Sequence, residues 1–208
     1  MQRSALVVGA SGIGGRYTAR ELLANGWTVY GLARHPPRDL PGLIPVAADL
    51  LDEVGLQAAL ADVAPTHVFI TTWMRQDTEA ENIRVNAALV RNLLDALSPK
   101  KSLRHVALVT GLKHYLGPFE AYASSGTLPD TPLRESQPRL PLDNFYYAQE
   151  DEVYAAAARD RFTWTVHRPH SIVGMAVGNA MNLGTTLAVY ATICKETGRP
   201  FRFPGSPA

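Results

Sequence analysis

Residues 4–15 read SALVVGASGIGG, and this stretch decides the fold class. The apolar run 4–9 is typical of a fully buried parallel strand, and a helical pattern starts at residue 12. In a dinucleotide-binding turn, Gly9 would permit the sharp bend, Gly12 the close approach of a pyrophosphate, and Gly15 the packing of helix on strand. The helix start would offer free N–H groups to the phosphates. The alternative is a tight turn without a ligand, but the strand-to-helix setting favours nucleotide binding.

Strand-like and helix-like segments alternate along the rest of the chain. Further strands are expected at residues 27–33, 44–48, 67–73, 104–110 and 163–168. Helices are expected at residues 12–25, 54–60, 80–97, 145–159 and 183–194. This alternation predicts an α/β fold, a Rossmann-type doubly wound parallel sheet with helices on both faces. The proline-rich stretch 115–143 is expected to be a functional loop rather than a linker.

The composition excludes several classes of protein. Twenty Lys and Arg against 19 Asp and Glu leave a net charge of +1, so no basic surface indicates nucleic acid or an acidic membrane as a partner. No apolar run approaches the roughly 20 residues of a membrane span, and we expect no signal peptide. Cys194 is the single cysteine, which rules out an internal disulfide and fits a reducing cytoplasm. No histidine pair has convincing metal-ligand spacing, so no metal is expected.

The end of the second strand bears on the choice of cofactor. A ribose 2′-hydroxyl would favour an acidic residue there, but the sequence places Arg34 and His35 at this point. An arginine is suited to a 2′-phosphate, and a protonated histidine would add a second donor. NADPH is therefore preferred over NADH, although NADH stays possible. Asp49 and Leu50 follow the third strand and are placed to contact the adenine, but Asp49 could equally cap the next helix.

Lysine and tyrosine side chains are expected at the crevice where the parallel strands end. Lys113 and His114 follow the fifth strand, and Tyr146 and Tyr147 open the helix beside it. A tyrosine hydroxyl near an ammonium group stabilises an oxyanion, and the ammonium lowers the tyrosine pKa. The alternative is that the tyrosines are structural, since this residue type often buries its ring.

These residues carry a resemblance to the short-chain dehydrogenase/reductase superfamily, and within it to the progesterone 5β-reductase/iridoid synthase-like enzymes. The resemblance covers nearly the whole chain. It rests on the strings GASGIG (9–14), ARHP (33–36), HVF (67–69), TW (72–73), TGLKHYLGPF (110–119), NFYY (144–147) and HRP (167–169), and on the region from MNL (181–183) to FPG (203–205).

The resemblance implies NADPH-dependent reduction of an activated carbon–carbon double bond conjugated to a carbonyl. The Tyr-x-x-x-Lys pairing of the wider superfamily is absent, since Tyr147 is followed by Asp151 and Tyr146 by Glu150. The resemblance to the family implies instead that the catalytic lysine comes from the loop after the fifth strand, which matches Lys113, and that the catalytic tyrosine is Tyr147, the second of the pair. Further cofactor contacts are expected at Ser11, Ile13, Thr72 and Thr110, and substrate-pocket residues at Phe119, Tyr115 and Trp73. Two arginines commonly stand where this chain has Arg34 and His35, so the strength of the NADPH preference is open.

Other functions remain as alternatives at this point. One is a nucleotide-sugar epimerase or dehydratase, against which the missing Tyr-x-x-x-Lys pairing counts. The other is a non-catalytic NADP(H)-sensing module. The expected partner is a small enone substrate, with no nucleic acid and no membrane, and a homodimer is compatible with the sequence.

The chain length bears on domain organisation. Residues 1–170 are expected to form the NADP(H)-binding domain with the catalytic residues, and residues 171–208 the beginning of a substrate-binding part. Relatives continue for on the order of 150 residues beyond this point. We therefore expect a C-terminally truncated product, or the ordered portion of a longer one, that binds NADPH but turns over poorly.

Two expectations concern the last helices. Glu150, Asp151 and Glu152 would be first-turn carboxylates that complement a helix dipole. Cys194 would be a core thiol on an apolar stripe formed with Leu183, Leu187, Tyr190 and Ala191.

Overall fold

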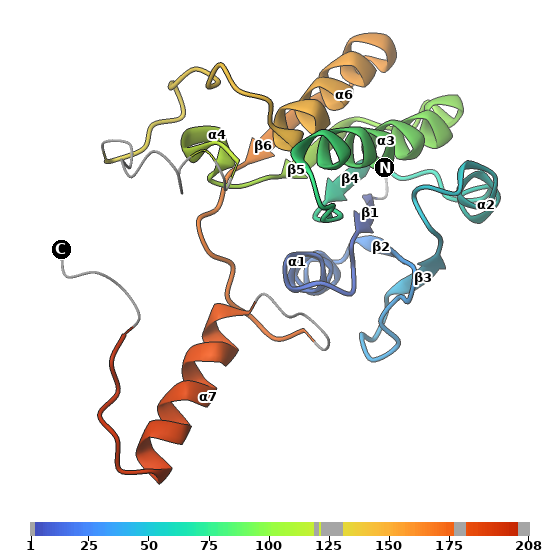
Figure 1. Ribbon diagram of the computed structural model, residues 1–208. Coiled ribbons are helices and arrows are strands. Elements are labelled where there is room, and N and C mark those ends of the chain that lie inside the picture. The colour runs from blue at the N-terminus through green and yellow to red at the C-terminus, as the bar shows by residue number, and fades with distance from the viewer. Residues whose placement is uncertain (1–2, 119–120, 122–130, 177–181, 204–208) are drawn as a thin grey trace.

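A computed structural model describes residues 3–118, 121, 131–176 and 182–203. Its centre is a six-stranded sheet in which every neighbouring pair is parallel, with strand order β3-β2-β1-β4-β5-β6 (Figure 1). The strands are β1 (Ser4–Val8), β2 (Thr28–Ala33), β3 (Ile44–Ala47), β4 (His67–Ile70), β5 (His105–Val109) and β6 (Thr163–His167). The order reverses between β1 and β4, which opens a crevice at the carboxyl ends of these strands. The predicted doubly wound sheet is confirmed.

The helices connect the strands on both faces of the sheet. They are α1 (Ile13–Ala24), α2 (Glu53–Ala59), α3 (Glu79–Leu97), α4 (Lys113–Leu116), α6 (Phe145–Asp160) and α7 (Leu183–Glu196), with a 3₁₀ turn at Ser98–Lys100. The predicted boundaries agree closely except in β4, which ends at Ile70, so Thr72 and Trp73 lie in the following loop. The short helix α4, which overlaps the first residues of the predicted proline-rich loop, was not anticipated.

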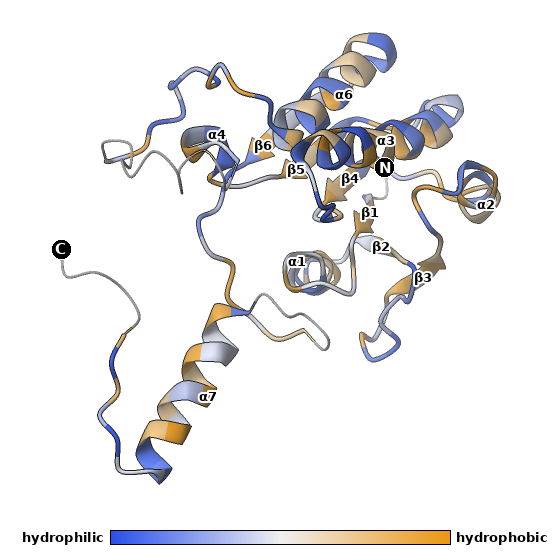
Figure 2. Cartoon of the chain, viewed as in Figure 1, coloured by the Kyte–Doolittle hydropathy of each residue, from blue (hydrophilic) through white to orange (hydrophobic). Residues whose placement is uncertain are grey.

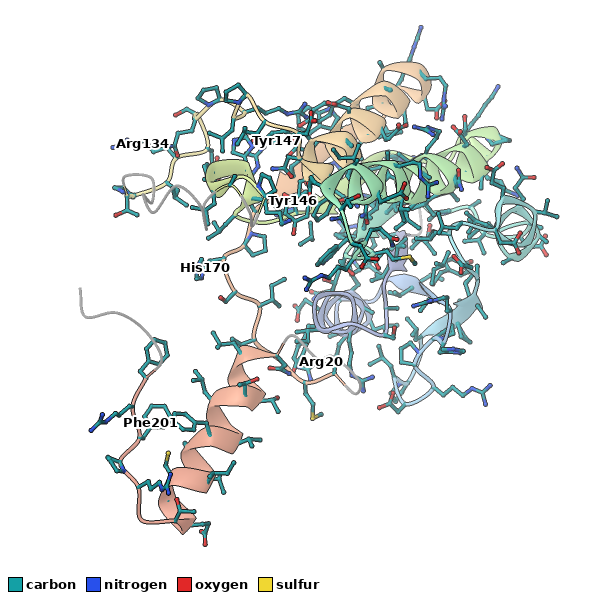
Figure 3. All side chains as sticks on the ribbon, viewed as in Figure 1. Arg20, Arg134, Tyr146, Tyr147, His170 and Phe201 are labelled. Carbon is teal, nitrogen blue, oxygen red and sulfur yellow. The ribbon has the colours of Figure 1, made fainter. Side chains whose placement is uncertain are left out.

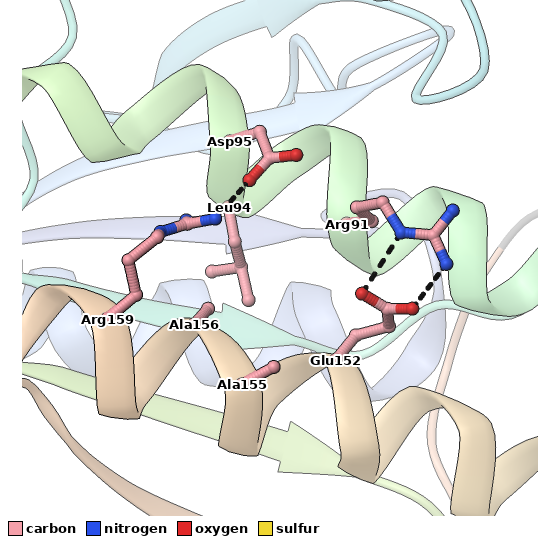
Figure 4. Close-up of a pocket in the computed structure, with 7 residues that line it drawn as sticks. All are labelled: Arg91, Leu94, Asp95, Glu152, Ala155, Ala156 and Arg159. Atoms are coloured by element: carbon pink, nitrogen blue, oxygen red, sulfur yellow. Dashed lines mark hydrogen bonds and ion pairs between the residues drawn. The ribbon is translucent and has the colours of Figure 1, made fainter.

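The main hydrophobic core lies between the sheet and the pair α3 and α6. Leu6, Val68 and Val106 from the sheet and Leu93 and Val153 from these helices are fully buried in it. The outer side of the helix pair carries a shallow pocket of about 140 Å³, bridged by the ion pairs Arg91–Glu152 and Arg159–Asp95 (Figure 4). Every residue that lines this pocket lies on α3 or α6, so the pocket belongs to the packing of these two helices.

The opposite face of the sheet is covered by α1. Val7 and Val29 pack there with Ala19 in a smaller core cluster. At the border of this cluster the His67 ring contacts Trp27 edge-on, with centroids 4.8 Å apart, and the His105 ring lies 6.2 Å from that of His67. These histidines pack within the sheet layer.

Helix α7 lies apart from the sheet, and hydrophobic residues run along it (Figures 1 and 2). The expectation that Cys194 is a buried thiol is confirmed, but none of the other four residues of its apolar stripe is buried. Cys194 is the helix's one buried residue, whereas Leu183 is 47% exposed and Ala191 is also exposed. The reason is that no other described element packs along the helix, so helical periodicity alone does not bury it. No helix in the described ranges is long and apolar enough to cross a membrane.

Candidate functional site

The glycine-rich turn after β1 requires glycine at two positions. Gly9 has φ +84°, a conformation that favours glycine, and a Cβ atom there would lie 3.0 Å from Thr71 Oγ1 and from Thr72 Cβ. A Cβ atom at Gly15 would lie 2.2 Å from the Gly9 carbonyl oxygen. Since that distance is far inside van der Waals contact, Gly15 is what lets α1 approach the turn so closely.

The start of α1 forms a cradle that fits a pyrophosphate. Its N-cap residue is Gly12, which has no side chain to satisfy the first-turn N–H groups. Ser11 is exposed beside this end, whereas the Ile13 side chain is buried, so Ile13 has only its backbone N–H to offer a ligand. Free N–H groups and the positive end of a helix dipole favour an anion at this point.

Arg34 and His35 follow β2 directly, and both are exposed. The structure contains an ion pair that the sequence pattern does not predict. Arg16 Nη1 and Nη2, in the first turn of α1, donate to Asp39 Oδ1 and Oδ2 at 2.9 and 2.7 Å. This bidentate contact connects the segment that carries Arg34 to the start of α1. The two residues are 23 positions apart, and no local pattern links them.

The residues expected near the adenine and the nicotinamide differ in whether their side chains are buried or already hydrogen-bonded within the protein. Asp49 Oδ1 accepts the N–H of Leu51, whereas the N-cap of α2 is Asp52, so the alternative that Asp49 caps this helix is wrong. Leu50 is buried, with 7% of its surface exposed. Thr72 is half-buried against Gly9. Thr110 is buried. Its hydroxyl donates a hydrogen bond to the His167 carbonyl of β6 at 3.3 Å, so this group is already paired.

Lys113 lies at the start of α4, directly after β5, as the sequence predicts. Its ammonium is 3.9 Å from Glu79 Oε2 and 4.8 Å from the centroid of the Phe145 ring. The Lys113 side chain is 27% exposed, so part of it remains open to solvent while it pairs with Glu79.

Tyr147, the expected catalytic tyrosine, is engaged elsewhere. Its hydroxyl donates to the His114 carbonyl at 2.9 Å and accepts the Leu140 N–H at 3.0 Å. The residue is 7% exposed, and the Arg139 guanidinium stacks 4.8 Å from its ring centroid. In this structure the Tyr147 hydroxyl therefore holds α4 and the segment around Leu140 to α6.

Tyr146 leaves the start of α6 in another direction, toward the end of β5 (Figure 3). A Cβ atom at Gly111 would lie 3.3 Å from its Oη, and its ring centroid is 4.3 Å from that of Phe145. Among the described residues no protein group forms a hydrogen bond with this hydroxyl. Burial, and to a lesser degree the charge of Glu79, raise the pKa of Tyr146 to about 12. This is opposite to the lowering expected from a nearby ammonium, because the burial of the hydroxyl is the larger effect.

Glu150 occupies the position four residues after Tyr146, where the wider superfamily has lysine. It is 1% exposed, with Arg139 at 2.8 Å and Arg168 at 3.2 Å. The prediction that it complements the helix dipole in the first turn is wrong, because Glu150 lies in the second turn and faces two arginines. Asp151 also pairs with Arg139, and Glu152 pairs with Arg91 across to α3.

Two of the three expected substrate-pocket residues can be located. Trp73 stacks on Phe145 with ring centroids 5.1 Å apart, next to Tyr146. Tyr115 is half-buried and packs edge-on against His114. Phe119 lies outside the described residues.

Residues 5–195 match the model of the NAD dependent epimerase/dehydratase family. Among curated proteins, the chain is 41% identical over 213 residues to an (S)-8-oxocitronellyl enol synthase of Nepeta racemosa, covering 97% of this chain and 54% of that protein. It is 40% identical to a 3-oxo-Delta(4,5)-steroid 5-beta-reductase of Arabidopsis thaliana, again over 97% of this chain and 54% of the relative. The chain thus spans about half the length of these relatives.

Solved structures share the fold. A UDP-glucose 4-epimerase of Thermus thermophilus in complex with NAD has a TM-score of 0.72 at 19% identity, covering 98% of this chain and 67% of that one. A protein described as a putative epimerase from Burkholderia cenocepacia has a TM-score of 0.67 at 27% identity, covering 92% of this chain and 61% of that one.

Proposed function

Because the chain belongs to the NAD dependent epimerase/dehydratase family, we propose that it reduces the activated C=C bond of α,β-unsaturated carbonyl compounds with NADPH. The observation that carries the proposal is the hydroxyl of Tyr146, which lies beside Gly111 at the end of β5 and has no hydrogen-bond partner among the described residues. The names of two relatives at about 40% identity, an enol synthase and a steroid 5-beta-reductase, support the same chemistry.

The cofactor-binding residues of this proposal are those at the ends of β1 and β2. The α1 N-terminus beyond Gly12 would hold the pyrophosphate, and Arg34 with His35 would hold a 2′-phosphate. Arg34 supplies a permanent positive charge there, whereas the contribution of His35 grows as it becomes protonated. When bound, the reduced nicotinamide supplies a hydride, which the β-carbon of the enone accepts.

The chain's own residues stabilise the charge that then develops on the substrate oxygen. Tyr146 Oη keeps its proton and donates a hydrogen bond to the enolate oxygen, and the Lys113 ammonium adds positive charge nearby. The α-carbon takes its proton from water, so that one hydride and one proton are added in total. In this proposal Tyr146 takes the role first expected of Tyr147, whose hydroxyl is held by backbone groups on both sides.

The epimerase alternative has less support from the residues present. Glu150 stands where a Tyr146-x-x-x-Lys pairing would need lysine, and it is buried against two arginines. The likeness to a UDP-glucose 4-epimerase at 19% identity concerns the fold alone.

The test is NADPH oxidation by the purified chain against a panel of cyclic and linear enones, with product analysis and a parallel arm containing UDP-glucose. Enone-dependent oxidation of NADPH with a saturated carbonyl product supports the proposal. Turnover of UDP-glucose would support the epimerase alternative, and cofactor binding without turnover of any compound would support a sensing module.

A further inference from the structure

Glu79, the first residue of α3, joins three elements at the candidate site. Its Oε1 accepts the backbone N–H of Phe145 at 2.8 Å, and its Oε2 lies 3.9 Å from the Lys113 ammonium. Oε2 also accepts a hydrogen bond from Asn82 at 3.3 Å within α3. The Glu79 side chain is only 18% exposed, so these contacts replace much of the water around the carboxylate.

The contact with Phe145 acts on the helix that carries Tyr146. Phe145 is the first residue of α6, and its N–H has no acceptor within its own helix. Glu79 therefore supplies that acceptor from 66 positions away, while Asn144 caps the next N–H, that of Tyr146. The negative carboxylate also lies at the positive end of the α6 dipole.

The contact with Lys113 restrains the ammonium on the same carboxylate. A long lysine side chain loses rotamer freedom when it is held, and a half-buried partner offsets that cost better than a surface one. The Phe145 ring lies under the same ammonium, 4.8 Å away, and Phe145 is fully buried. Lys113, Phe145 and Tyr146 are thus all fixed with respect to Glu79.

We propose that Glu79 is a positioning residue of the reductase site: it sets the Lys113 ammonium against the start of α6 and places a negative charge near the Tyr146 hydroxyl that disfavours the phenolate. The proposal rests on the function proposed above. Among the described residues, the charge that acts on Tyr146 is that of Glu79 from α3, and Glu79 in turn pairs with Lys113 from α4. Loss of the Glu79 charge would remove an anion that disfavours the phenolate and would also leave the Lys113 ammonium uncompensated. Both changes act in the same direction, toward deprotonation.

The test is the pKa of Tyr146, followed by NMR of tyrosine labelled with ¹³C at Cζ, between pH about 8 and about 11. The chain has eight tyrosines, and the Tyr146→Phe spectrum identifies the signal of Tyr146. In the wild-type chain this signal should stay that of the phenol over most of this range, since the pKa is about 12. In Glu79→Gln the pKa should fall, while burial, the larger cause of the raised value, keeps it above the ordinary value of 10.0.

Glu81→Gln is the matched control. Glu81 lies on the same helix but pairs with Arg84 at the surface, so its loss should leave the Tyr146 signal unchanged. If Glu79→Gln does not fold, Glu79→Asp keeps the charge, withdraws it by one methylene, and should lower the pKa by less. The proposal is overturned if Tyr146 has the same pKa in the folded Glu79 variant as in the wild-type chain. It is also overturned if Glu81→Gln shifts the pKa of Tyr146 by as much as Glu79→Gln does.

Kinetics separate positioning from a general loss of structure. Glu79→Gln should lower kcat for enone reduction and leave the KM for NADPH near wild type, because Arg34 and the α1 N-terminus are untouched. A raised KM for NADPH with unchanged kcat overturns the proposal. The NMR measurement needs no turnover, so it decides the role of Glu79 even if Tyr146→Phe shows that the proposed reaction is wrong.

Discussion

The Tyr147 hydroxyl donates a hydrogen bond to the carbonyl oxygen of His114 at 2.9 Å. Because the same hydroxyl also accepts the Leu140 N–H, both its donor and its acceptor capacity are used inside the protein. The neighbouring Tyr146 presents a hydroxyl that no described residue engages. Of the two adjacent tyrosines, Tyr147 therefore holds neighbouring segments together, and Tyr146 is the one that the proposed function assigns to chemistry.

Tyr147→Phe should destabilise the fold by about 1–3 kcal/mol, because it leaves the buried carbonyl of His114 and the half-buried N–H of Leu140 without their partner. Urea unfolding followed by circular dichroism measures this. Tyr146→Phe is the matched control and should change stability by less, since its hydroxyl makes no hydrogen bond with the described residues. Equal stabilities of wild type and Tyr147→Phe would contradict the structural role.

Gly15→Ala should be strongly destabilising, because the added Cβ would lie 2.2 Å from the Gly9 carbonyl oxygen. Gly12→Ala is the comparison, since its Cβ would lie 3.4 Å from the same oxygen and needs little adjustment. We expect Gly12→Ala to fold but to bind NADPH more weakly, as measured by a fluorescence titration. A Gly15→Ala protein as stable as Gly12→Ala would contradict the close approach of α1.

Arg34→Ala should raise the apparent KM for NADPH by about 10- to 100-fold, since a charge-assisted hydrogen bond contributes about 1.5–3 kcal/mol. The KM for NADH should change little, because NADH lacks the 2′-phosphate. Arg20→Ala removes a charge of the same sign from α1, where the guanidinium stacks on Tyr17, and should affect neither value. An equal rise in the KM for NADPH and for NADH in Arg34→Ala would show that Arg34 does not bind the 2′-phosphate.

Stability should fall as the pH drops below about 6.5. Burial, followed by the charge of neighbouring groups, lowers the pKa of His67 and of His105 below the ordinary value of 6.5. The unfolded chain therefore takes up these protons first. The stabilisation is present above the unfolded pKa and is lost as the pH falls through the folded pKa. Urea unfolding at several pH values measures how steeply the free energy of unfolding depends on pH, and His67→Gln should reduce that dependence. An unchanged dependence in His67→Gln would show that other groups cause it.

The fold could be predicted from sequence because its signals are local. The glycines of residues 9–15 and the alternation of buried strands with amphipathic helices each depend on neighbours within a few positions. Helix α7 shows the limit: its periodicity predicts a helix, but whether an apolar stripe is buried depends on what packs against it.

The site could be predicted only in part, for a geometric reason. Adjacent residues on a helix point about 100° apart, so the sequence offered no means to decide which of Tyr146 and Tyr147 faces the crevice. That choice depends on contacts with His114 and Leu140, which the fold brings together. The role of Glu79 was missed because its contact with Phe145 spans 66 positions, and no local sequence pattern connects residues so far apart.

The most direct test of the central claim compares enone-dependent NADPH oxidation by the wild-type chain, Tyr146→Phe and Tyr147→Phe, each verified as folded. Loss of a hydroxyl that donates to the reacting oxygen should lower kcat by about 10²- to 10⁴-fold in Tyr146→Phe. The folded fraction of Tyr147→Phe should keep a rate close to wild type. A wild-type rate in Tyr146→Phe together with an inactive, folded Tyr147→Phe would contradict the account.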